Sequence, residues 1–258
     1  MTMFKSTPKN NTTAPAFYAQ PTFLRRAALR DWWTLLHPPY TMLHLSYVVI
    51  GACLLGPVNA VRLGVTAIAF FLAVGVGAHA LDELHGRPLS TSISSKQLVG
   101  AAVLGLGGAV ALGIVGAVLV SAYLLVFIAL GIAVALAYNL ELFHGRFHSD
   151  AVFALSWGTF PLLTSYFAQH GSLSVSSLFA GAFAALVSQT QRQLSTPARD
   201  LRRRTSSVEG QQVLNDGTVI AITDRTLLAP LERALRSLCW ASVALALALL
   251  YLRFTPHL

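Results

Sequence analysis

Long apolar stretches constrain the fold of this sequence more than any other feature. Several approach or exceed the roughly 20 residues that a helix needs to cross a lipid bilayer, whereas a membrane β-barrel would show shorter, alternating segments. The chain is 55% hydrophobic and 11% charged, with a mean hydropathy of +0.62, which lies outside the range of water-soluble globular domains. The sequence therefore predicts an all-α, polytopic integral-membrane helical bundle. We place seven transmembrane helices at about 32–55, 60–80, 98–118, 121–140, 151–169, 174–195 and 232–253.

The predicted spans divide the chain into two parts. Residues 1–30 are expected to form a cytosolic segment, and its first 20 residues, which are rich in Thr, Pro, Asn and Ala, are expected to be disordered. Residues 31–258 are expected to form a single transmembrane domain with a cytosolic loop at about 196–231. One bundle thus carries whatever chemistry the chain performs.

Charged residues gather on one side of the predicted topology. Lys and Arg favour the cytoplasmic side of a membrane, and with a cytosolic N-terminus only Arg62 and Arg253 fall on the other side. All acidic residues fall on the inner side as well. We therefore expect an integral protein of the inner, cytoplasmic membrane if the source is bacterial, with its polar chemistry at the cytosolic face.

The net charge of +8 raises the question of a nucleic-acid partner. The basic residues are spread over juxtamembrane segments without interleaved stacking aromatics or a nucleic-acid-binding motif. Anionic lipid headgroups account for them more simply, and we expect no nucleic acid as a partner.

A motif of the form carboxylate-x-x-His-Gly-Arg occurs twice, in "HALDELHGR" from His79 and in "YNLELFHGR" from Tyr138. The first copy pairs Asp82 with His85, and the second pairs Glu141 with His144. Residues three apart share a helix face, so each pair can present two ligands to one point. Two such pairs on facing helices are typical of di-iron and di-manganese carboxylate sites in four-helix bundles.

Further candidate ligands cluster at the same predicted level. Six of the eight histidines fall at or just inside the inner ends of the spans, and ionisable groups near hydrocarbon are costly enough to mark functional sites. For His44 the alternative is a hydrogen bond between helices, and for His148 it is an ordinary loop position. The additional predicted ligands or supporting groups are His37, His44, His79, Glu83 and His148, and the predicted catalytic residues are Asp82, Glu83 and Glu141.

Four arginines are candidate substrate contacts. Arg87 and Arg146 follow the two motif histidines, where they could grip an anionic headgroup or neutralise the carboxylates, or simply anchor helix ends at the interface. Arg202 and Arg203 lie in the predicted loop at about 196–231, which is either a solvated basic connector or a lid or phosphate-binding arm that also uses Arg199 and Arg204.

Three segments, "LRDWWTLLHPPYTMLHLSYVVIGA", "AHALDELHGRPLSTSIS" and "ALAYNLELFHGRFHSD", resemble the UbiA superfamily of intramembrane prenyltransferases. In that family an Asp-rich motif that holds magnesium on a prenyl diphosphate is followed by Arg-Pro-Leu, which "GRPLST" matches here. The resemblance covers roughly residues 28–205 and implies a UbiA-like bundle. The chain departs from the family because "HALDELH" replaces the first Asp-rich motif, only Asp200 remains in the second, and the family typically has more spans.

The departures decide the predicted chemistry. Magnesium prefers oxygen ligands, whereas imidazole suits iron, zinc, copper or nickel. We therefore expect two transition-metal ions, iron, in a membrane oxidoreductase that activates oxygen to modify a lipid-like or isoprenoid substrate, with an electron donor as a partner.

Two other functions stay open. The first is a UbiA-type prenyltransferase, in which Asp82, Glu83 and Glu141 hold magnesium and the arginines bind a prenyl diphosphate. The second is a haem- or metal-binding membrane carrier that uses His44 and His79 as paired axial ligands. The oligomeric state is not predicted.

Overall fold

The computed structural model describes residues 24–255, so the expected disorder of residues 1–20 lies outside the described part of the chain. The described chain is mostly helical, as predicted, and adds one short β-hairpin. Its elements are α1 (Ala27–Leu36), α2 (Pro38–Cys53), α3 (Ala60–Phe70), η1 (Phe71–Ala78), α4 (His79–Leu84), α5 (Ser95–Leu119), α6 (Leu124–Asn139), α7 (Asp150–Ala154), η2 (Leu155–Thr159), α8 (Phe160–His170), α9 (Val175–Arg203), β1 (Gly210–Val213), β2 (Val219–Ile222) and α10 (Asp224–Phe254).

Four of the described helical stretches are long and apolar enough to cross a membrane, judged by length and composition. They are Ala60–Leu84, Ser95–Leu119, Asp150–His170 and Asp224–Phe254. Only 17% of the most apolar window of Ser95–Leu119 is buried inside the bundle. Such an apolar outer surface is unfavourable in water and suits a lipid environment.

Two of these stretches contain a π-helical segment. Ala60–Leu84 is a continuous rod of α3, η1 and α4, and Asp150–His170 is a continuous rod of α7, η2 and α8. Wide turns of this kind are frequent at functional sites. Both segments lie beside the candidate site described below.

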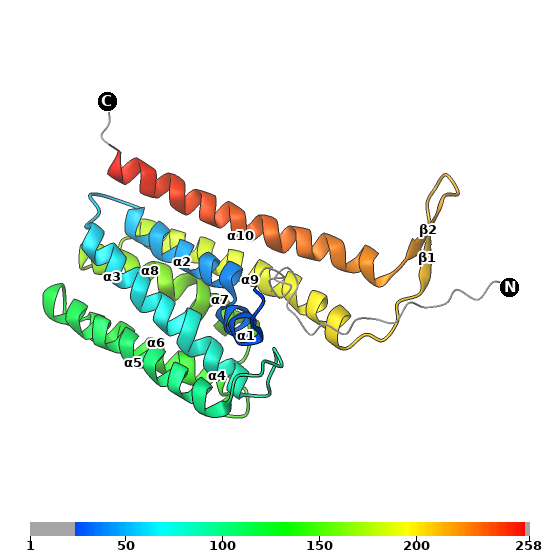
Figure 1. Cartoon of the computed structure of the whole chain (residues 1–258). Helices are drawn as coiled ribbons and strands as arrows, with labels where there is room; N and C mark the ends of the chain where they lie inside the picture. Colours follow the sequence, from blue (N-terminus) through cyan, green and yellow to red (C-terminus); the bar gives the residue numbers. More distant parts are fainter. Residues whose placement is uncertain (1–23, 256–258) are drawn as a thin grey trace.

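The bundle packs around α2. Helix α2 contacts α8 on one side and α10 on the other, while α5 packs along η1 (Figure 1). A buried cluster that includes Leu43, Tyr47, Leu162 and Cys239 fills the centre of this arrangement. Gly51 of α2 lies so close to α8 that an added Cβ would sit 2.2 Å from the carbonyl oxygen of Leu162, so the contact depends on glycine.

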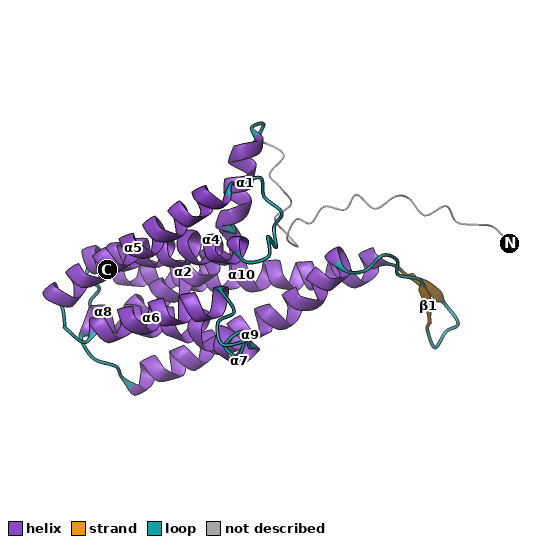
Figure 2. Cartoon of the chain, turned by 90° about the horizontal axis from the view of Figure 1, so that it is seen from below, coloured by secondary structure: helices purple, strands orange, loops and turns teal. Residues whose placement is uncertain are grey.

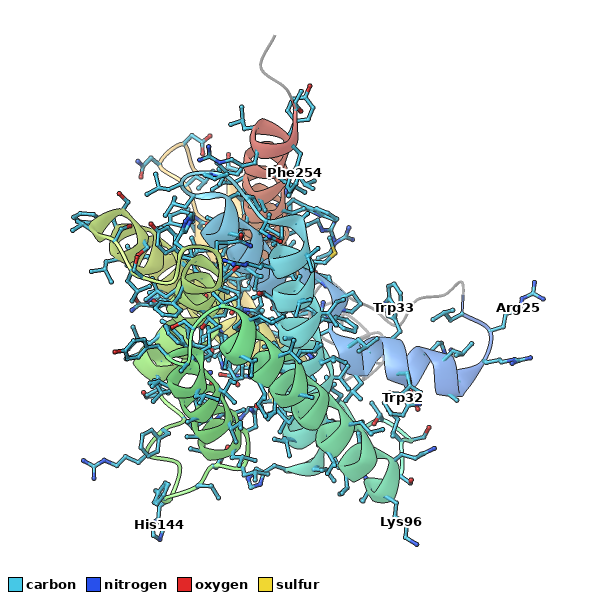
Figure 3. The ribbon with its side chains drawn as sticks, turned by 90° about the vertical axis from the view of Figure 1, so that its left-hand side faces the viewer. Arg25, Trp32, Trp33, Lys96, His144 and Phe254 are labelled. Carbon is cyan, nitrogen blue, oxygen red and sulfur yellow. The ribbon has the colours of Figure 1, made fainter. Side chains whose placement is uncertain are left out.

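The first predicted span, 32–55, is two helices rather than one. α1 ends at a left-handed residue, His37, with φ 44° and ψ 58°, and α2 begins at Pro38. A residue before proline is disfavoured in the helical region, which accounts for the break. Figure 3 shows α1 projecting sideways from the bundle, with Arg25 and Trp33 toward its exposed side.

Residues predicted as a loop at about 196–231 differ from that prediction at both ends. Helix α9 continues through Pro197 to Arg203, and α10 already begins at Asp224. Between them lies the antiparallel hairpin β1–β2, which pairs Gly210 with Ile222 at its open end. The ends of α9 and α10 and the hairpin reach beyond the rest of the bundle (Figures 1 and 2).

Candidate functional site

A polar pocket of about 200 Å³ opens near one end of the bundle, among α2, α4, α6, η2 and α9. It is lined by an aromatic pair, Tyr138 and Trp157, whose rings meet edge to face. Its charged and imidazole side chains are His37, His44, His79, Asp82, His148, Arg192, Arg199, Arg202 and Arg203. Four predicted histidines and Asp82 therefore lie on one cavity.

Three of these histidines are held in the same way. The distance from Nδ1 to a backbone carbonyl oxygen is 2.9 Å for His44 at Trp157, 3.2 Å for His79 at Gly75 and 3.3 Å for His148 at Tyr138. A carbonyl oxygen only accepts hydrogen bonds, so each Nδ1 donates. These bonds fix the orientation of the rings at the pocket wall.

His37 reaches the pocket because of the break between α1 and α2. Its ring centroid lies 4.7 Å from that of His79, with the two ring planes tilted by 31°. The left-handed backbone at His37 directs a residue from a helix junction into the same space as residues from α4.

The predicted four-ligand cage is not formed. Asp82 lines the pocket, but His85 and Glu141 lie outside its lining. The Glu141 carboxylate has Oε2 at 3.7 Å from Nε2 of His85 and Oε1 at 3.8 Å from Nδ1 of His148, and about half of its side chain is exposed. His144 points away from the bundle (Figure 3). Within residues 24–255, no group of three or more His, Cys, Asp or Glu side chains is arranged to hold a metal ion.

The reason lies in where the helices end. Helix α4 stops before His85, whose backbone is extended, and α6 stops at Asn139. Glu141 and His144 sit in consecutive turns with positive φ angles of 48° and 59°. A spacing of three residues places side chains on one face only within a helix, so neither pair presents its two members together.

Glu83 has a different role from the predicted one. Its carboxylate is fully buried and accepts hydrogen bonds from the backbone N–H of Leu89 at 2.8 Å and of Thr91 at 2.9 Å, and from the Thr91 hydroxyl. Both oxygens are thereby committed to the loop between α4 and α5. This carboxylate holds the loop in place and does not face the pocket.

Two of the four predicted substrate arginines lie away from the pocket. Arg87 donates to the Ile93 carbonyl oxygen at 2.6 Å and to the Ser95 hydroxyl at 2.8 Å, and so closes the same loop. Arg146 is exposed and is not part of the pocket lining. Arg202 and Arg203 do line the pocket, and Arg202 forms an ion pair with Glu232 of α10.

Sequence reasoning placed Arg199 in the possible phosphate-binding arm but gave Arg192 no place in the site. Arg192 donates to Asp150 and to the Tyr138 hydroxyl, and its guanidinium lies 5.1 Å from the Phe153 ring centroid. Together with Arg199 and the residues after it, Arg192 forms a basic stripe at helical spacing along α9. The sequence prediction ended this helix near residue 195 and so separated Arg192 from Arg199 and the arginines after it.

Arg199 and Arg203 are the arginines available to a ligand. Neither side chain forms a hydrogen bond or ion pair within the part of the chain that the structure describes, and they lie four residues apart on α9. A bound anion favours the charged form of both guanidinium groups, so this wall of the pocket suits a negatively charged group.

An apolar groove of about 360 Å³ adjoins the polar pocket. The two cavities share Val74 of η1 and Trp157 of η2. Elsewhere the groove runs between α3, α5, α6 and α8 past rings such as those of Phe127 and Phe160. Some of its lining is exposed on the outside of the bundle, including Leu119 at 73%, so the groove is accessible from the side.

Comparisons with known proteins return no relative. No protein-family model, no curated protein and no solved structure matches this chain. The resemblance to the UbiA superfamily therefore stays a prediction from sequence motifs.

Proposed function

We propose that this chain is an integral-membrane transferase that binds a prenyl diphosphate, with arginines rather than a carboxylate-bound metal cluster holding the anion. This is the prenyltransferase alternative from the sequence, altered at its metal site. The observation that carries it is the junction at Val74 and Trp157, where a basic pocket meets an apolar groove. A molecule with an anionic head and a long apolar tail fits both cavities at once.

The proposed setting is a UbiA-like bundle of seven spans. Helices α2, α6 and α9 cross the bilayer beside the four stretches that are long and apolar enough by themselves. The N-terminus and the hairpin lie in the cytosol, since the basic residues concentrate at that end. The polar pocket then opens near the cytosolic headgroups, and the groove faces the lipid tails.

The arginines supply the chemistry of anion binding. A guanidinium matches phosphate oxygens with two parallel hydrogen bonds, and charge placed where the leaving group develops stabilises the transition state. In the proposed reaction the bond between prenyl C1 and the diphosphate oxygen breaks and its electron pair leaves with the diphosphate. The acceptor forms a bond to C1 and releases a proton to water.

The residues present do not fit the metal centres that the sequence predicts. Among the described residues, Asp82 is the one carboxylate that lines the pocket, because Glu83 holds a loop and Glu141 lies outside. A three-carboxylate magnesium site and a His/carboxylate di-iron site both require these groups together. For this reason the oxidoreductase is the weaker proposal.

The haem carrier is also less well supported. His44 and His79 do line one cavity, but its volume of about 200 Å³ lies below the roughly 300–1,000 Å³ of pockets that hold drug-sized ligands. A haem group placed between the two imidazoles would need more space than this.

Binding of farnesyl diphosphate to the purified chain in lipid nanodiscs tests the proposal. We expect saturable binding, and release of diphosphate when a membrane extract supplies the acceptor, with and without a chelator. Absence of farnesyl diphosphate binding would refute the proposal. About two equivalents of iron in a protein without that affinity would instead support the di-iron oxidoreductase.

A further inference from the structure

The polar pocket has a second wall, made of hydrogen-bond acceptors. His44, His79 and His148 each direct Nδ1 at a backbone carbonyl oxygen and still line the pocket. A neutral imidazole that donates from Nδ1 carries a lone pair at Nε2. Each ring can therefore offer one acceptor atom to a ligand.

A fourth acceptor comes from α9. The Gln191 side chain lines the same pocket and is 6% exposed. Its Oε1 atom is buried and has no hydrogen-bond partner among the described residues. Buried amide oxygens are nearly always paired, so Oε1 of Gln191 is available to a hydrogen-bond donor in the pocket.

The arrangement of these acceptors selects the kind of donor. No group of three or more His, Cys, Asp or Glu side chains in the described chain is arranged to hold a metal ion. A cationic ligand is also disfavoured beside Arg199 and Arg203, because like charges repel. Neutral hydroxyl groups spread over one molecule satisfy both conditions.

We propose that Nε2 of His44, Nε2 of His79 and Oε1 of Gln191 form a subsite for a small polyol phosphate, with His148 at its edge. The hydroxyl groups donate to these acceptors, while the phosphate lies against Arg199 and Arg203. The inference rests on the proposed function in one respect, since it uses the same two arginines to hold an anion. It adds that the pocket also accepts a phosphate that carries several hydroxyl groups, in competition with the prenyl diphosphate, because one pair of arginines holds one anion at a time.

Two matched soluble probes test the subsite. Glycerol 1-phosphate and propyl phosphate share a phosphate and a three-carbon chain, and they differ by two hydroxyl groups. A site built to bond hydroxyls rejects an analogue that lacks them, so we expect the wild-type chain to bind glycerol phosphate at least about tenfold more tightly. Calorimetric titration of the protein in nanodiscs measures both affinities.

Variants on α9 and α4 assign the preference to the named atoms. Gln191→Leu and His79→Phe are expected to reduce it to below about threefold while leaving propyl phosphate binding unchanged. Gln193→Leu is the matched control, because Gln193 lies on the same helix but is exposed. Thermal melting of each variant shows whether it is folded.

The outcomes separate this inference from the proposed function. Equal binding of both probes by the wild-type chain overturns the hydroxyl subsite, and binding of farnesyl diphosphate in the same preparation would leave the proposed function standing. A preference that persists in both Gln191→Leu and His79→Phe also overturns the assignment. If neither soluble phosphate nor farnesyl diphosphate binds, both proposals fail.

Discussion

Replacing Arg203 by glutamine should weaken prenyl diphosphate binding strongly. Arg203 is half-buried at the pocket wall and forms no hydrogen bond or ion pair within residues 24–255, so the substitution breaks no direct contact of that kind among these residues. A hydrogen bond to a charged group contributes about 1.5–3 kcal/mol, and about 1.4 kcal/mol corresponds to a tenfold change in Kd. We therefore expect Arg203→Gln to raise the Kd for farnesyl diphosphate by about 10–150-fold.

Arg199→Gln should have a smaller effect, because Arg199 is exposed at the rim of the pocket. Water and salt screen exposed charges, so we expect a loss of about three- to tenfold that shrinks further in high salt. The loss at Arg203 should be less sensitive to salt, since buried charges are screened less.

Arg204→Gln is the matched control for both variants. Arg204 is the C-cap residue of the same helix, its side chain is 80% exposed, and it pairs with Asp200 at 3.5 Å. Titration of farnesyl diphosphate into nanodiscs, followed by tryptophan fluorescence, reports on Trp157 in the pocket wall. An equal loss of affinity in Arg204→Gln and Arg203→Gln would show that binding depends on net charge alone and would refute the reasoning.

Three further predictions follow from the packing. Gly51→Ala should lower the free energy of unfolding by about 1–3 kcal/mol, because its Cβ would meet the Leu162 carbonyl oxygen at 2.2 Å; an unchanged melting temperature would argue against this contact. Glu83→Ala should destabilise the chain by about 1–3 kcal/mol and expose the loop at 85–94 to protease, because buried backbone N–H groups lose their acceptor; wild-type resistance to cleavage would contradict this role. Gly131→Phe should fill the apolar groove, weaken farnesyl diphosphate binding at least about tenfold, and leave propyl phosphate binding unaffected; equal losses for both ligands would contradict a separate tail site.

The apolar character and the crowding of histidines could be predicted from the sequence. Each of the four described stretches that are long and apolar enough to cross a membrane contains one of the predicted spans. His79 and Asp82 both line the pocket, and their spacing of three lies within one helix, α4. Here the local pattern and the final structure follow the same helical geometry.

The second copy of the motif could not be interpreted in the same way. The sequence match between the two copies is good, but α6 ends at Asn139, before Glu141 and His144, and the chain then turns repeatedly through positive φ angles. Helix ends are decided by packing and capping as much as by local sequence. The two copies of the motif therefore have different backbone geometry, although their sequences match.

The placement of the α9 arginines on one continuous helix was missed for a related reason. Pro197 and the surrounding charges indicated the end of a helix, since proline removes a backbone hydrogen bond inside one. The helix nevertheless continues to Arg203. With that continuation, Gln191, Arg199 and Arg203 come to lie on one pocket, a relation that depends on tertiary structure.

The two π-helical segments have a consequence for how this chain can vary. Val74 lies in η1 and Trp157 in η2, so both walls of the junction between the polar pocket and the apolar groove lie in π-helical segments, which hold more residues per turn than an α-helix. Deleting one residue from α3 would rotate everything after it, including His79 and Asp82, by about 100°. A deletion within η1 would instead convert the wide turn to an ordinary one, so chain length should be more tolerant of change in η1 than in α3.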